Sequence, residues 1–121
     1  SDVLCIESER EALLQFKQHL IDPSNRLSSW AVGADDCCKW ARVVCDNLTG
    51  HVHEIHLRNP YGDYQSEAEF EAYQHHKLGG KISPSLLNLK HLNHLDLSRN
   101  GFEGIPIPSF IGSLESLRYL N

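Results

Sequence analysis

The sequence predicts an α/β solenoid of short parallel strands, closed at its N-terminal end by a helical cap that disulfides hold together. Two observations lead to this fold class. An apolar motif recurs along the second half of the chain, and all four cysteines lie in its first part. With 121 residues, the chain is long enough for one small domain but not for two.

The recurring motif has apolar residues at its first, fourth and sixth positions. The second and third copies start 25 residues apart (92 to 117), which is a period typical of stacked structural repeats. A single coil of this kind leaves its apolar face exposed, so we expect the coils to stack and share one core. Asn100 should lie inside the turn that follows, where its amide satisfies backbone groups of adjacent coils. The copies are Val52-x-x-Ile55-x-Leu57, Leu92-x-x-Leu95-x-Leu97 and Leu117-x-x-Leu120.

An acidic insert separates the first two copies. They start 40 residues apart (52 to 92), about 16 more than a repeat of about 24 residues requires. The surplus lies at about residues 61–77. Ser66 and Glu69 form a capping box there, which predicts a short surface helix with Phe70 and Tyr73 on one face. The acidic residues of the insert are Asp63, Glu67, Glu69 and Glu71, against Lys77.

The strand motif also predicts a ligand-binding face. Side chains alternate across a strand, so the residues between the inward leucines should face outward on the concave surface. Parallel stacking about 4.8 Å apart predicts two ladders, each with a histidine beside a carboxylate. We interpret this patch as a candidate recognition surface whose histidine charge varies with pH, or else as a solvated polar ladder. The predicted residues are Glu54, His56, Arg58, His94, Asp96, Ser98 and Tyr119, and the ladders are Glu54–His94–Tyr119 and His56–Asp96–Asn121.

Residues 1–50 are predicted to form the cap, and residues 51–121 about three repeats. We expect a helix over residues 8–21, with Ser8 as N-cap and Asp22-Pro23 as its stop. Trp30 and Trp40 lie near the cysteines, so we expect them in the core rather than in a sugar-binding site. The apolar stripe of the helix consists of Leu13, Phe16 and Leu20, with Leu14 and Ile21 on its edge.

The four cysteines indicate disulfides rather than zinc, because adjacent cysteines are poor ligands for one tetrahedral ion. A bridge between Cys37 and Cys38 would form a strained ring, which leaves two pairings open. The triplet Asn47-Leu48-Thr49 is a sequon for N-glycosylation and favours a secretory route. The cysteines are Cys5, Cys37, Cys38 and Cys45.

These segments together resemble the N-terminal cap and first repeats of plant leucine-rich-repeat receptors. Residues 9–17 (EREALLQFK), 22–30 (DPSNRLSSW) and 37–45 (CCKWARVVC) resemble the cap, and residues 92–117 resemble the repeat LxxLxLSxNxLxGxIPxxLxxL. The resemblance implies the pairings Cys5–Cys37 and Cys38–Cys45. One departure is Arg42, where the family pattern has glycine, which puts the tightness of that loop in question.

The resemblance implies an extracellular binding module, in the apoplast or in the ectodomain of a plasma-membrane protein. The expected partner is a protein or peptide, for example a microbial protein or a co-receptor in defence signalling. Polygalacturonase-inhibiting proteins share the same cap and repeat type, so the alternative is a stand-alone secreted defence protein, either an inhibitor of microbial wall-degrading enzymes or a small antimicrobial. The motif stops at Asn121, so we expect either a fragment of a longer receptor or a short protein. Its exposed Leu117 and Leu120 would then favour self-association.

Composition excludes several other classes. The net charge of −5 with scattered basic residues argues against nucleic acid. The apolar runs are too short for a membrane span. No nucleophile elbow or phosphate loop is present, and the acidic residues of the insert are better explained as a solvated helix face than as a glycosidase pair. We therefore expect no catalytic residues, no cofactor and no metal.

Overall fold

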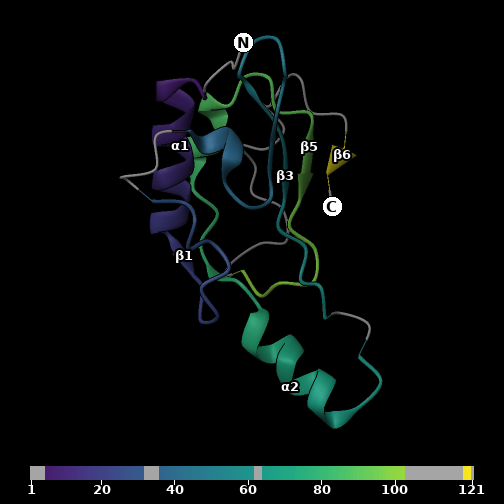
Figure 1. Cartoon of the computed structure of the whole chain (residues 1–121). Coiled ribbons are helices and arrows are strands. Elements are labelled where there is room, and N and C mark those ends of the chain that lie inside the picture. Colours follow the sequence, from purple (N-terminus) through teal and green to yellow (C-terminus); the bar gives the residue numbers. More distant parts are fainter. Residues whose placement is uncertain (1–4, 32–35, 62–63, 103–118, 121) are drawn as a thin grey trace.

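The structure is a computed structural model that describes residues 5–31, 36–61, 64–102 and the backbone of residues 119–120. At its centre is a sheet with the strand order β2–β3–β5–β6. β3 (Val52–His56), β5 (His94–Asp96) and β6 (Tyr119–Leu120) run parallel, whereas β2 (Val43–Cys45) pairs antiparallel with β3. Helix α1 (Glu7–Gln18) lies on the side opposite β6, and α2 (Glu67–His76) projects beyond the strands (Figure 1).

The register of the parallel strands is the one that the repeat spacing predicts. Glu54 lies opposite His94, and His56 opposite Asp96. His94 in turn lies opposite Tyr119. The solenoid interpretation is therefore confirmed for the described strands. Asp63, Leu117, Asn121 and the turn expected between residues 104 and 108 lie outside the described residues, and so does the side chain of Leu120.

The inward residues of the two described motifs form the core. All six are buried, and they join apolar residues of the cap in one cluster. Burying an aliphatic side chain of this size stabilises a fold by about 1.5–3 kcal/mol, so these residues supply the main driving force for stacking. The six are Val52, Ile55, Leu57, Leu92, Leu95 and Leu97.

Asn100 joins successive coils, as expected. Its Nδ2 donates to the carbonyl of Leu57 at 2.7 Å and to the carbonyls of Leu97 and Ser98 at 3.2 Å. Its Oδ1 accepts from the backbone N–H of Leu78 at 2.9 Å. These groups lie where strands end and ladder bonds stop, so the amide satisfies backbone groups that would otherwise be unpaired.

Helix α1 differs from the prediction at both ends. It begins at Glu7 with Ile6 in the N-cap position and without a side-chain cap, so the prediction of Ser8 as N-cap was wrong. The N–H of Cys5 is held by the carboxylate of Asp36 at 3.1 Å, which helps to fix where the chain enters the helix.

The same helix ends at Gln18 instead of residue 21, because the chain then forms β1 (Leu20–Ile21). β1 pairs antiparallel with β4 (Gly79–Gly80). Gly80 has φ +86°, and a Cβ there would collide with the carbonyl oxygen of His19, so only glycine allows this close approach. Strand pairing therefore competes with the helix, and Ile21 is exposed rather than part of the helical stripe.

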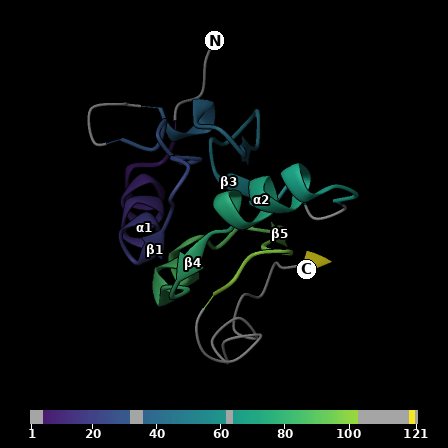
Figure 2. The same cartoon turned by 90° about the horizontal axis from the view of Figure 1, so that it is seen from below.

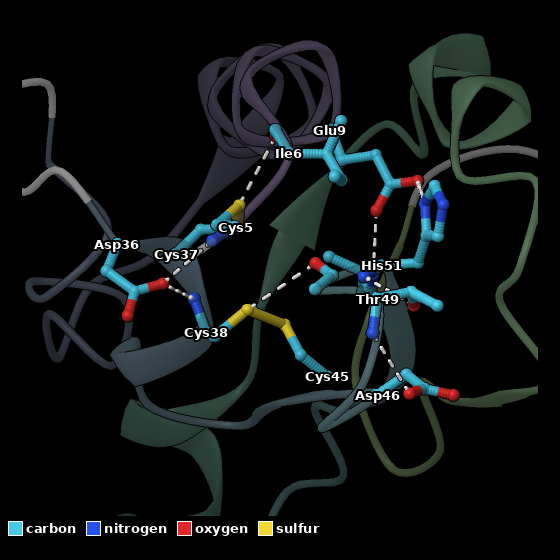
Figure 3. Close-up of a disulfide and its surroundings, with 12 residues drawn as sticks. Cys5, Ile6, Glu9, Asp36, Cys37, Cys38, Cys45, Asp46, Thr49 and His51 are labelled. Atoms are coloured by element: carbon cyan, nitrogen blue, oxygen red, sulfur yellow. Dashed lines mark hydrogen bonds and ion pairs between the residues drawn. A yellow bond between two sulfur atoms is a disulfide. The ribbon is translucent and has the colours of Figure 1, made fainter. Parts of the chain in front are cut away.

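The disulfides are Cys5–Cys37 and Cys38–Cys45, which confirms the pairing that the family resemblance implied. The first fixes the segment before α1 to the short 3-10 helix Cys37–Lys39, and the second joins that helix to β2 (Figure 3). Trp30 and Trp40 are both buried and stack with ring centroids 5.8 Å apart. Both tryptophans therefore belong to the core.

A buried carboxylate holds the cap against the first coil. Glu9 of α1 is 3% exposed, and its Oε1 accepts from the N–H of Val52 at 2.6 Å. Its Oε2 lies 2.8 Å from Nδ1 of His51, as Figure 3 shows. The last turn before β3 is thus hydrogen-bonded to the cap helix, in addition to the apolar packing between them.

Arg42 has a left-handed backbone, with φ +71°. This is the position where the related pattern has glycine, so the loop keeps the glycine conformation although the residue is arginine. A non-glycine residue in this region costs about 1–3 kcal/mol. The loop retains its tightness, and the strain is carried by Arg42.

Replacing Arg42 with glycine should stabilise the chain. The substitution relieves the left-handed strain and is partly offset by the greater freedom of glycine in the unfolded state, so the net gain should be about 1 kcal/mol. Thermal unfolding followed by circular dichroism should show a midpoint roughly 4 °C higher. Lys39→Gly, an exposed position without a positive φ, is the control and should not raise the midpoint. An unchanged or lower midpoint in Arg42→Gly would show that the backbone is not strained there.

Replacing Asn100 with alanine should destabilise the chain by about 2–3 kcal/mol, because several backbone groups lose their partner together. Urea denaturation measures the effect, and Asn88→Ala, at an exposed position of the same residue type, should cost less than about 0.5 kcal/mol. Equal effects of the two substitutions would contradict the role of Asn100 as a link between coils.

Candidate ligand-recognition surface

The outward side chains of β3 and β5, and of the residues that directly follow these strands, lie on one face of the sheet. We call this surface the strand face, and it consists of Glu54, His56, Arg58, His94 and Ser98. They reach this face because the alternate residues of each strand are committed to the core. Glu54 and His56 are about one-third exposed, and Arg58 is exposed. The parallel register brings Glu54 and His94 side by side. Polar side chains are thus presented to solvent on a rigid sheet.

Histidine and carboxylate meet within one strand of this face, in addition to the predicted cross-strand register of Glu54 with His94. Nε2 of His56 lies 2.7 Å from Oε1 of Glu54, two residues earlier on the same strand. The ring of His56 also contacts that of His94, with centroids 4.4 Å apart. The strand face therefore presents a carboxylate and two imidazole rings in contact with one another.

Asp96 does not belong to the exposed surface, and this part of the prediction was wrong. Its side chain is buried, at 8% exposed. Its Oδ1 accepts from the hydroxyl of Ser98 at 2.6 Å and from the backbone N–H of Ser98 at 3.0 Å. The carboxylate therefore shapes the end of β5, and it does not pair with His56.

β2 extends the strand face beyond the repeats. Val44 lies opposite Glu54 in the antiparallel pair and is exposed. The carbonyl of Arg42 accepts from the N–H of His56 at 2.9 Å, so Arg42 also lies beside β3. Sequence reasoning missed both residues because the cap was treated as a separate unit. The sequence offers no alternation that would have shown this, because Val43 is buried and its equally apolar neighbour Val44 is exposed.

The acidic insert forms a second exposed surface, as the capping box predicted. The hydroxyl of Ser66 accepts from the N–H of Glu69, and Oε1 of Glu69 accepts from the N–H of Gln65, both at 3.1 Å. Helix α2 has no buried residue. Its aromatic side chains therefore cluster in contact with solvent, with Tyr64 joining the predicted pair. The centroid distances are 4.8 Å for Tyr64–Phe70, 5.4 Å for Tyr64–Tyr73 and 6.3 Å for Phe70–Tyr73.

Arg26 fixes the insert relative to the strand face. Its guanidinium donates to the carbonyls of His76, Leu57 and Arg58 at 2.8–3.0 Å and to Oδ1 of Asn100 at 3.1 Å. Burial lowers the pKa of Arg26 below its usual value, the charge of Asp22 raises it, and Arg42 lowers it further. Sequence reasoning gave no signal for this residue, because its partners are backbone carbonyls far away in the chain.

The predicted glycosylation sequon lies in the turn between β2 and β3. Asn47 and Thr49 are exposed, and Leu48 is 86% exposed. The carboxylate of Asp46 accepts from the N–H groups of Leu48 and Thr49. The bond from Leu48 is the main reason why the pKa of Asp46 lies below its usual value, although its slight desolvation acts in the opposite direction. The turn therefore presents the asparagine to solvent in a fixed conformation.

Among the described residues, Cys5, Cys37 and Cys38 lie close enough together to be considered as metal ligands. Their sulfurs, however, are already joined in disulfides. A disulfide sulfur is not a thiolate ligand. The described residues also contain no helix that is long and apolar enough to cross a membrane.

Comparison with known proteins identifies both parts of the chain. Residues 6–46 match the leucine-rich-repeat N-terminal domain. The chain is 49% identical over 120 residues to receptor-like protein EIX1 of Solanum lycopersicum, a match that covers 98% of this chain and 11% of that protein. The chain therefore spans about a tenth of the length of this relative.

Two solved structures have the same fold. The ectodomain of BIR2 from Arabidopsis thaliana superposes with a TM-score of 0.73 at 28% identity, covering 100% of this chain and 55% of that one. The ectodomain of the Arabidopsis receptor kinase HAESA, in complex with an IDA peptide hormone ligand, gives a TM-score of 0.69 at 27% identity, covering 93% and 16%.

Three findings indicate the same fold: the cap with its two disulfides, the parallel register of the repeats and the similarity to these relatives. The relatives also place the chain outside the cell, in the apoplast or in the ectodomain of a plasma-membrane protein. The chain belongs to the plant extracellular leucine-rich-repeat family of receptor-like proteins, and it comprises the N-terminal cap domain and first repeats.

Proposed function

We propose that the chain is part of the ligand-recognition ectodomain of a plant receptor-like protein that acts in defence signalling. The observation that carries the proposal is the parallel register, which aligns Glu54 and His56 with His94 on an exposed face. Those side chains are not needed for the core, so they are available to bind a protein or peptide. The solved relative in complex with a peptide hormone supports a polypeptide ligand.

The aromatic cluster of α2 adds a second contact surface. Tyrosine and phenylalanine supply much of the binding energy at protein interfaces, because they bury a large area with few rotatable bonds. Here Tyr64, Phe70 and Tyr73 remain at the surface of the folded chain. An isolated helix of ten residues would not be stable on its own, and its C-terminal end is held by Arg26. The insert is therefore presented at a fixed place for a partner.

The alternative is a stand-alone secreted defence protein, either an inhibitor of microbial wall-degrading enzymes or an antimicrobial. Its binding surface would be the same strand face. The similarity to receptor-like proteins favours the receptor.

The proposal predicts that strand-face substitutions weaken recognition without affecting folding. The full-length natural protein that carries this chain would be expressed in leaves and challenged with a panel of secreted microbial proteins and plant peptides. His56→Ala with His94→Ala should raise the concentration for a half-maximal response about tenfold or more. Lys39→Ala with Lys90→Ala, at exposed positions outside the strand face, is the matched control. Equal responses of the two double variants, at equal surface accumulation, would refute the strand face as the binding site.

We also propose that Asn47 carries an N-glycan when the chain passes through the secretory pathway. The exposed turn allows access to the side-chain amide, and Thr49 supplies the hydroxyl that the sequon requires. Intact mass spectrometry of the secreted protein should show added mass that an N-glycosidase removes. Thr49→Ala should lack it, and Thr49→Ser should retain it. A secreted chain of unmodified mass would exclude the modification.

A further inference from the structure

Three arginines meet where β3 ends: Arg26, Arg42 and Arg58, which we call the arginine corner. Nη2 of Arg26 donates to the carbonyl of Arg58 at 2.8 Å. The charge of Arg42 lies close enough to lower the pKa of Arg26. The carbonyl of Arg42 in turn accepts from the N–H of His56, two residues before Arg58. The backbones of two exposed arginines therefore lie next to the half-buried Arg26, on a chain whose net charge is −5.

The fold uses only one of the three guanidinium groups. Arg26 is half-buried, and backbone carbonyls and Asn100 occupy its donors. Arg42 and Arg58 are exposed, and neither side chain makes a hydrogen bond or ion pair with the described part of the chain. Two exposed guanidinium groups, each with five donors, are thus available to a partner.

The acidic side chains of this region hydrogen-bond with groups other than the two exposed arginines. Glu54 is engaged by His56 at 2.7 Å, and Asp96 by Ser98 at 2.6 Å. The carboxylate of Asp22 accepts from the backbone N–H groups of Arg26 and Leu27. These carboxylates thus hydrogen-bond with other groups, and none of them is ion-paired with Arg42 or Arg58.

Arg42 is also costly for the fold. It holds a left-handed conformation, with φ +71°, that glycine would adopt without strain, and its charge repels that of Arg26. A strained residue that makes no stabilising side-chain contact points to a role outside the fold. Its position beside β3 places that role on the recognition surface.

We propose that Arg42 and Arg58, with Arg26 as a fixed charge behind them, bind a carboxylate-bearing segment of a polypeptide ligand. Guanidinium groups pair with carboxylates through two parallel hydrogen bonds, so the arginine corner selects acidic side chains on the ligand. The proposal rests on the proposed function, because it names the ligand chemistry that one end of the strand face accepts.

The test is a titration of the isotopically labelled chain with hexaglutamate at low salt, followed by backbone amide and arginine Nε–Hε signals. Signals of Arg42, His56 and Arg58 should shift, and hexalysine should leave them unchanged. Arg42→Gln and Arg58→Gln should each weaken hexaglutamate binding about threefold, and together about tenfold. Lys39→Gln and Lys90→Gln, which remove exposed charges elsewhere, should bind like the wild type.

The variant Arg42→Gly separates a binding role from a structural one. It should be more stable than the wild type and yet bind hexaglutamate more weakly, whereas a purely structural residue would not combine these effects. The proposal is overturned if hexaglutamate shifts none of these signals, or if Arg42→Gln with Arg58→Gln binds it like the wild type. A response to oligogalacturonate alone would overturn the polypeptide ligand and point to a wall polysaccharide. The receptor assay with His56 and His94 variants is independent of this titration, so either idea can fail without the other.

Discussion

The guanidinium of Arg26 connects segments that share no continuous secondary structure. It donates to the carbonyls that follow β3, to the carbonyl of His76 at the end of α2, and to Asn100 in the next coil. Parallel strands this short leave carbonyls unpaired at their ends, and such groups are costly when buried. Arg26 and Asn100 satisfy them together. The cap, the insert and the repeats therefore hold a fixed relative position, which a recognition surface made from all three requires.

The cap contributes to the strand face as well as covering the end of the core. β2 pairs with β3 and adds Val44 and Arg42 to the row of exposed side chains. Figure 2 shows α1 and β1 on one side of β3 and β5, with β6 on the other. The disulfide Cys38–Cys45 ends in β2, so it also fixes the edge of the recognition surface. The stability of the cap and the shape of the proposed binding surface therefore depend on the same residues.

The strand register, the insert helix and the role of Asn100 were predictable from the sequence, because each follows from local spacing or a local capping pattern. Asp96 was misjudged because alternation alone places it outside, whereas the hydroxyl of Ser98 and the chain turn draw its carboxylate inward. Glu9 and Arg26 gave no signal, because their partners are backbone groups of distant segments. The predicted C-terminal end of α1 was wrong because residues 20–21 pair as a strand with β4, about 60 residues later in the chain. Contacts that depend on the assembled fold are the ones that a single sequence conceals.

Arg42 illustrates how a local rule is broken at the proposed recognition surface. Glycine would relieve the backbone strain and remove a repulsion with Arg26, so the fold alone would favour glycine at this position. Arginine instead keeps the turn and adds an exposed charged side chain at the edge where cap and repeat meet, where its backbone carbonyl accepts from the N–H of His56. The loop geometry is already fixed by β2 pairing and by the disulfide, so the scaffold tolerates the strain. A rigid cap thus allows a residue that is unfavourable for folding to occupy an exposed position on the proposed recognition surface.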